Sequence, residues 1–398
     1  MSAFSATCRW IREACIPTLF RRCYFTIYGP EQFIRSELFI SVSLRPYIHS
    51  LVINEECVDQ WTQGKPGGMF LTDNFLLCGA YPGAAVAERL RELPHLRFLK
   101  IYKRHDQTHG LSWSTLRSIL SVPQLREFEL CYLYFCPVLR PEEELNIETL
   151  APLTHFKYQM HFTREVLSFP PETPALAAVL KKLSATLETL ILSSEPAPMS
   201  ALAQWHWPCL RTLVLRGSPW ADLSEPLVAV CSKMPNLRSL TLKLNPTHHA
   251  MTQALWPHGF PSSFPWPHLE QLTVSYPDPT DVIYDHLPPS LHSLSLRCWN
   301  HIFVQQRFVG LRQTYTLRYD SVLGASAILS IMRRSTMPHL AHLEIEYRAD
   351  DDDDALLQYI ATTFPRLTSL KISRYRPNAS DKVVPTVGCL RTRTIPCA

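Results

Sequence analysis

The sequence has few glycines and lacks the motifs by which many enzymes hold phosphates or activate a nucleophile. Only 12 of its 398 residues are glycine, and no GxGxxG, GxxxxGKS/T, GxSxG or kinase signature occurs. Glycine-rich loops are needed where backbone N–H groups must approach a phosphate closely. We therefore expect no enzymatic activity, no catalytic residue and no bound cofactor.

Paired cysteines are also missing. The 12 cysteines are scattered along the chain, and no CxxC pair occurs. A zinc ribbon would show such pairs, and a disulfide scaffold would be short and dense in cysteine. Cys131, Cys231 and Cys298 lie inside apolar segments, where a cysteine acts as a small buried hydrophobe. We therefore predict no metal site, and a reducing compartment, cytoplasmic and/or nuclear.

Long runs of one character are absent too. The 39 basic and 35 acidic residues leave a formal charge of +4 with no long basic run, which gives no reason to expect nucleic acid or an anionic membrane as partner. No run reaches 18 apolar residues, the length that spans a bilayer. Arg9, Arg12 and Glu13 interrupt the apolar stretch that a signal peptide would need near the N-terminus.

What the sequence does contain is one pattern written many times. LRTLVLRGS from Leu210, LRFLKIYKR from Leu96 and LTSLKISRY from Leu367 share the frame LxxLxL. Further copies begin at Leu125, Leu187, Leu237, Leu269, Leu291 and Leu340, and weaker ones lie at 44–56, from Leu153 and from Leu311. Repetition at this scale indicates a stacked-repeat architecture.

A helical segment and a proline precede the strand pattern in many copies. In TLRSILSVP, for example, Leu116, Ile119 and Leu120 share one helix face, and Pro123 ends the helix. Copies spaced by about 20 to 34 residues match leucine-rich repeats. We predict an α/β leucine-rich-repeat solenoid, arc- or horseshoe-shaped, with parallel strands on the concave face and helices on the convex face. It would hold about ten to twelve repeats over residues 44–375, followed by a tail or cap at 376–398.

Residues 1–25 predict a helix ended by Pro17, with a strand from Leu19 to Tyr28. Within them SAFSATCRWIREACIPTLFRRC, Ser2 to Cys23, resembles the closing half of the F-box of fungal F-box proteins with leucine-rich repeats. The opening Leu-Pro-x-Glu helix of such a box has no counterpart after Met1.

The resemblance implies the substrate-recognition subunit of an SCF-type cullin–RING ubiquitin ligase. The box would bind a Skp-type adaptor, provided that a complete F-box exists upstream, and the repeats would bind a protein substrate. The alternative is a stand-alone repeat scaffold or inhibitor without a ligase.

Partner-binding residues are expected between and just after the core leucines, since alternate strand residues face opposite ways. We select Lys100, Tyr102, Glu129, Arg216, Lys243, Ser275, Arg297, Glu344, Glu346 and Lys371. The basic middle and the acidic later part of this set suggest a polarised concave face that suits a partner of complementary charge. The alternative is a row of solvated strand residues.

Two other local features have structural interpretations. The acidic run Asp350–Asp354 directly precedes a helical segment, where negative charge and an N-cap are favourable, and it lacks the spacing of a calcium loop. The proline- and tryptophan-rich insertions Ser193–Pro208 and Ala254–Leu269 are expected to pack over the edges of the solenoid rather than to bind a ligand.

Overall fold

The computed structural model describes residues 8–57, 72, 74–103, 109–160, 168–220, 225–244, 254–261, 263–298 and 322–375, and the backbone of 387–390. The chain divides into two compact units, which we call unit 1 (residues 1–201 and 205–209) and unit 2 (202–204 and 210–398). Their boundary falls inside the range 44–375 that the repeat pattern assigns to one solenoid.

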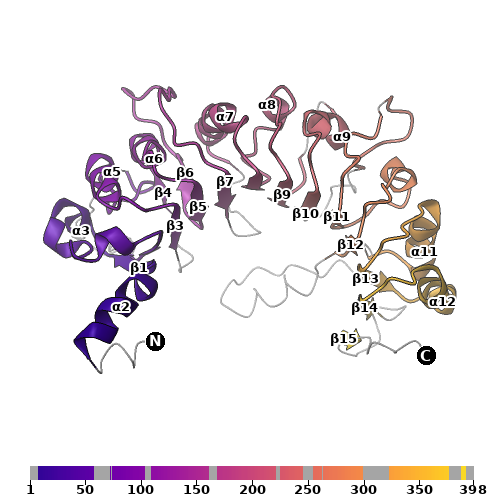
Figure 1. The fold of residues 1–398 in the computed structure, drawn as a ribbon. Coiled ribbons are helices and arrows are strands. Elements are labelled where there is room, and N and C mark those ends of the chain that lie inside the picture. Colours follow the sequence, from indigo (N-terminus) through magenta and orange to yellow (C-terminus); the bar gives the residue numbers. More distant parts are fainter. Residues whose placement is uncertain are drawn as a thin grey trace, which may run out of the picture. The chain divides into compact units, whose positions relative to one another are not determined.

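Unit 1 consists of parallel strands, each paired with the next along the chain, and helices that lie on one side of them (Figure 1). The strands are β1 (Arg22–Ile27), β2 (Ser50–Glu55), β3 (Phe98–Lys103), β5 (Glu127–Cys131), β7 (His155–Gln159) and β8 (Thr189–Ser193). The helices are α2 (Arg9–Leu19), α3 (Glu31–Ile34), α5 (Gly83–Arg91), α6 (Trp113–Leu120) and α7 (Glu172–Leu183), and a small second sheet pairs β4 (Gly110–Leu111) with β6 (Tyr134–Phe135).

Unit 2 repeats this arrangement. Its parallel strands are β9 (Thr212–Gly217), β10 (Ser239–Leu244), β11 (Gln271–Val274), β12 (Ser293–Leu296), β13 (His342–Arg348) and β14 (Ser369–Tyr375), and β15 (Val387–Leu390) pairs antiparallel with β14. The helices are α9 (Leu227–Val230), α11 (Ala325–Arg334) and α12 (Asp353–Thr363), while α8 (Met199–Leu202) lies at the unit boundary. Successive parallel strands with intervening helices are the architecture of a leucine-rich-repeat solenoid, as predicted.

The LxxLxL frame builds the core by stacking like residues in register. Leu213 of β9 aligns with Leu240 of β10, which aligns with Leu272 of β11, and all three are buried. The predicted helix positions Leu116 and Ile119 are also fully buried. Each repeat thus contributes one layer to a continuous apolar core that no single repeat can form alone.

Three details of the sequence-based prediction can be compared with the structure. Pro17 does not end the first helix but lies within α2, which continues to Leu19. The β12 strand pairs directly with β13, and the weak repeat proposed from Leu311 lies outside the described residues. The insertions pack as predicted, because Trp207, Trp256 and Trp266 are buried. No described helix is both long and apolar enough to cross a membrane.

Candidate functional site

The strand face of unit 1 carries a ladder of paired charges. The parallel register places Lys100 beside Glu129 and Glu129 beside Lys157. The Nζ atoms of the two lysines lie 3.3 and 3.5 Å from Glu129 Oε2, and Tyr102 receives the Lys100 ammonium over its ring at 5.8 Å. The predicted residues Lys100, Tyr102 and Glu129 are therefore brought together, and they partly neutralise one another.

The strand face of unit 2 does not have the open acidic half that the sequence suggested. Arg297 and Glu346 are each only 1% exposed. Arg297 pairs with both Glu344 and Glu346, and Lys371 Nζ lies 2.8 Å from Glu344 Oε1. The Tyr375 hydroxyl donates a hydrogen bond of 2.5 Å to Glu346. The register of β12, β13 and β14 sets these charges side by side, so they form ion pairs with one another.

Ser275 is also inside the structure rather than on its surface. Its hydroxyl lies 2.5 Å from the Leu244 carbonyl oxygen, to which it donates, and it accepts from Leu244 N at 2.7 Å. It thereby extends the contact between β10 and β11 beyond their paired residues. Ser275, which the sequence suggested as a partner-binding residue, therefore hydrogen-bonds to the backbone of the neighbouring strand.

Two basic side chains on the unit 2 strand face lie next to each other. Arg216 of β9 is in register with Lys243 of β10, and both are half-buried. Burial, and then the neighbouring Arg216 cation, lower the pKa of Lys243 to about 8. Like charges held together at the surface favour an anionic partner, because a carboxylate placed there would relieve the repulsion. We call these two residues the basic pair.

The acidic run contacts the start of a neighbouring helix, but it does not provide the side-chain cap that we predicted for its own helix, α12. The N-cap residue of α12, Asp352, makes no side-chain cap hydrogen bond. Asp350 instead accepts hydrogen bonds from Ser326 N and Oγ at the start of α11, and these help to lower its pKa against the effect of burial. Asp353 accepts from Tyr347 and Arg374. The run therefore joins neighbouring repeats.

The first part of the chain exposes apolar surface. Helix α2 contains no buried residue, and Trp10 on it is 77% exposed. Six of the eight large apolar side chains that the described residues expose lie between residues 10 and 42. Tyr24 of β1, 66% exposed, is among them. Contiguous exposed apolar groups are unusual on a protein surface without a partner.

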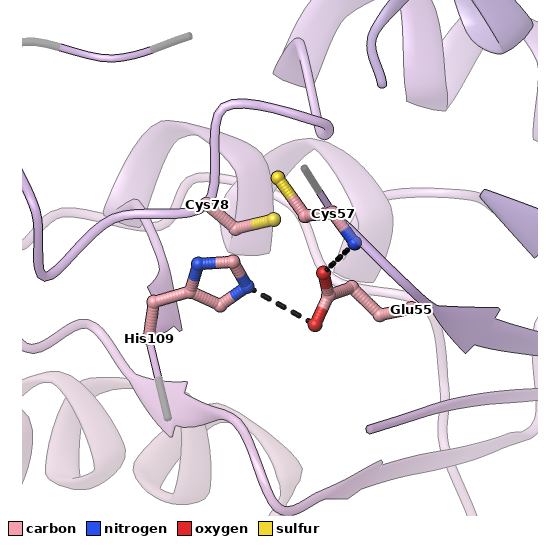
Figure 2. Close-up of side chains that lie close together, drawn as sticks. All are labelled: Glu55, Cys57, Cys78 and His109. Carbon is pink, nitrogen blue, oxygen red and sulfur yellow. Dashed lines mark hydrogen bonds and ion pairs between the residues drawn. The ribbon is translucent and has the colours of Figure 1, made fainter. Parts of the chain in front are cut away.

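A buried polar cluster in unit 1 was missed by the sequence reasoning. It consists of Glu55, Cys57, Cys78 and His109, whose potential ligand atoms all lie within 4.8 Å of one another (Figure 2). Glu55 is the last residue of β2, and its Oε1 accepts from Cys57 N at 2.5 Å. The four side chains come from three separate segments of the sequence, so no CxxC-like spacing indicates the cluster.

The small β4–β6 sheet and its neighbours hold two members of the cluster in place. Cys78 N donates to Gly110 O at 2.8 Å, and Gly110 N donates to Leu76 O at 2.8 Å. Gly110 itself has no room for a side chain, because a Cβ atom would lie 2.5 Å from the Tyr134 carbonyl oxygen. His109, just before it, is therefore fixed by backbone contacts on both sides.

The charges around the cluster are unusual for an interior. Glu55 Oε2 lies 3.0 Å from His109 Nε2 and 3.4 Å from Lys103 Nζ, and all three side chains are almost completely buried. Burial raises the pKa of the Cys78 thiol well above its ordinary value. Burial alone would raise the pKa of Glu55, but His109 and Lys103 outweigh it and lower the pKa.

Comparisons with known proteins leave the identity of the chain open. No family model and no curated protein match it. One solved structure, described as the crystal structure of the Rad7 and Elc1 complex in yeast, is similar over 98% of this chain and 88% of the matched chain, with 15% identity and a TM-score of 0.37. A structural similarity with so low a TM-score does not establish the fold or the function of this chain.

Proposed function

We propose that this protein is a protein-interaction module of the cytoplasm and/or nucleus, and the substrate-recognition subunit of an SCF-type ubiquitin ligase. Leucine-rich-repeat solenoids offer extended strand faces that suit protein partners. The F-box resemblance of Ser2–Cys23 covers α2, which the structure leaves without a buried residue. In this proposal α2 and β1 bind a Skp-type adaptor, and the strand face of unit 2 binds the substrate.

The exposed apolar side chains of α2 and β1 are the observation that carries the adaptor-binding role. Trp10 and Tyr24 together offer the large, rigid apolar groups that dominate the energy of many protein interfaces. Such groups lose little conformational entropy when they are buried. An adaptor that covers them removes an apolar surface from water, which favours binding at roughly 25 cal/mol for each Å².

Binding of the full chain, together with any F-box helix encoded upstream of Met1, to a purified Skp-type adaptor tests this role. We expect the wild-type chain to bind, and Trp10→Ala to weaken binding by about 30-fold, as loss of an interface hot spot of about 2 kcal/mol would. Leu357→Ala, which truncates an exposed apolar residue of unit 2, is the matched control and should bind like the wild type. Absence of binding by the wild-type chain would reject the ligase role and leave a stand-alone repeat scaffold.

The substrate side of the proposal rests on the basic pair. Arg216 and Lys243 lie in register on neighbouring strands, and burial and the Arg216 cation together lower the pKa of Lys243, so we assign to them an acidic segment of the substrate. An oligo-glutamate peptide serves as the probe, and fluorescence anisotropy measures its binding. Arg216→Glu combined with Lys243→Glu should abolish the binding, and added salt should weaken it in the wild type. The exposed Lys181→Glu is the control, and equal binding by all three proteins would refute the assignment.

A further inference from the structure

The buried cluster of unit 1 offers four ligands that metals prefer, and it offers them on converging side chains. Cys57 and Cys78 supply sulfur, His109 supplies Nε2, and Glu55 supplies a carboxylate oxygen. Within the described part of the chain this is the one group of at least three such residues whose ligand atoms meet. The four residues are between 0% and 7% exposed, so their polar atoms converge in the interior and not at the solvated surface.

The spacing of these atoms is close to that of a tetrahedral site. Zinc binds sulfur at about 2.3 Å and nitrogen or oxygen at about 2.0–2.2 Å, which places neighbouring ligand atoms roughly 3.3–3.8 Å apart. The cluster keeps all its ligand atoms within 4.8 Å. Side-chain rotations that move the ligand atoms by about 1 Å or less would therefore complete the coordination without a change in the backbone.

We propose that Glu55, Cys57, Cys78 and His109 form a structural zinc site, which is independent of the partner-binding role proposed above. Two thiolates and an imidazole favour a borderline-soft ion such as Zn²⁺ over Mg²⁺ or Ca²⁺, which prefer oxygen ligands. Four protein ligands fill a tetrahedral shell and leave no position for water or substrate. The site thus stabilises the fold and performs no chemistry.

The buried Lys103 balances the charge of such a site. Zn²⁺ with two thiolates, one carboxylate and a neutral imidazole has one excess negative charge. The ammonium of Lys103 lies 3.4 Å from Glu55 Oε2 and is fully buried, so the zinc-bound cluster is neutral as a whole. An uncompensated charge at this depth would be costly, which gives Lys103 a reason to be there.

The site would join segments that are distant in the sequence. Glu55 ends β2 and Cys57 follows it, Cys78 lies next to the bridge between Leu77 and Gly110, and His109 precedes β4. Zinc would tie these three segments together at the ends of the first strands of unit 1. This arrangement matches structural zinc sites, in which the free energy of metal binding adds to that of folding.

Metal analysis of the full-length chain tests the proposal. The protein is purified without chelator or a histidine tag, incubated with zinc and desalted, and its zinc is measured by mass spectrometry. We expect about one zinc per chain, as a single four-ligand site requires, and a loss of most of it in Cys57→Ser and in Cys78→Ser. Cys231→Ser removes an equally buried thiol outside the cluster and should keep the zinc.

Two measurements on the wild-type chain remain decisive even where a variant fails to fold. Replacement of zinc by cobalt should give visible bands of tetrahedral Co²⁺ and a thiolate-to-cobalt charge-transfer band, and chelation should lower the melting temperature, with recovery on adding zinc. A zinc-free wild-type protein without these bands would overturn the proposal. So would a Cys57–Cys78 disulfide found by peptide mapping in the freshly purified protein, or equal loss of zinc in the Cys231→Ser control.

Discussion

Each unit holds a cluster of polar side chains whose centre is buried, and the two clusters differ in how their donors and acceptors are matched. In unit 2, Arg297 contacts Glu344 and Glu346, Lys371 contacts Glu344, and Tyr375 donates to Glu346. Cationic and hydroxyl donors stand opposite the carboxylate acceptors. A buried charge network of this kind is closed, because each partner already has the group that its burial demands.

The unit 1 cluster has ligands in excess of its cations. Glu55 alone contacts both the Lys103 ammonium and the His109 imidazole, while the thiols of Cys57 and Cys78 lie beside them. Thiols are weak hydrogen-bond donors and gain little from such a position. Buried charged groups alone therefore do not indicate a metal-binding site. Converging metal-ligating groups that outnumber the cations beside them do indicate one.

The largest effect is expected from breaking the unit 2 network. Arg297→Met leaves the buried Glu346 without its cation and should lower the free energy of unfolding by about 3–5 kcal/mol, as measured by urea denaturation. Arg238→Met is the control, since the Arg238–Glu270 pair on the same unit is exposed and should contribute at most about 1 kcal/mol. Equal costs for the two variants would show that the network is not closed as described.

The second-largest effect is expected from zinc, which should stabilise the chain through the unit 1 cluster and not through the unit 2 network. Zinc present at about 100 times its dissociation constant should stabilise the metal-free chain by about 2.7 kcal/mol, measured from the shift of the urea midpoint of the unit 1 transition. Cys57→Ser should lose this gain. Tyr375→Phe should keep it, because Tyr375 lies in β14 of unit 2 and its hydroxyl donates to Glu346. A lost gain in Tyr375→Phe would contradict the independence of the two clusters.

A smaller effect tests one hydrogen bond of the unit 2 network. Tyr375→Phe removes only the hydroxyl that donates to the buried Glu346 carboxylate and should cost about 1.5 kcal/mol, as a hydrogen bond to a charged group does. Tyr359→Phe is the control, because its hydroxyl contacts the Met332 carbonyl oxygen at 3.3 Å and is only partly buried. A Tyr375→Phe protein as stable as the wild type would show that this hydrogen bond does not stabilise the network.

The smallest effect concerns the basic pair. The pKa of Lys243 is about 8 in the folded chain, below its ordinary value of 10.5, so the unfolded chain binds more protons between these values and the wild type gains stability as the pH rises through that window. Lys243→Met should therefore be more stable than the wild type, by about 1 kcal/mol below pH 8.

Urea midpoints measured from pH 7 to pH 10.5 check this dependence. The advantage of Lys243→Met should shrink as the pH rises and be smallest at pH 10.5, where the lysine is neutral in the folded chain and half protonated in the unfolded chain. The exposed Lys181→Met should show no such trend. A constant difference across the range would mean that Lys243 keeps its ordinary pKa.

Much of the fold could be predicted from local sequence, and little of the candidate sites could. Leu213 and Leu215 of LRTLVLRGS face the core because strand residues alternate, a rule that needs no knowledge of the neighbours. The burial of Arg297 and Ser275 could not be foreseen, because it depends on which residues of β10 and β13 lie beside them. Their positions just after the strands were correct, and their exposure was not.

The sequence by itself determined the repeated unit, since an apolar residue at each core position has a local physical reason. Only the tertiary structure decided which side chains meet. Cys57, Cys78 and His109 carry no mutual signal along the chain, and the stacking of the first repeats is what brings them to Glu55. A pattern that recurs about every 20 to 34 residues can be recognised in the sequence. A cluster of ligands from separate segments exists only once the chain has folded.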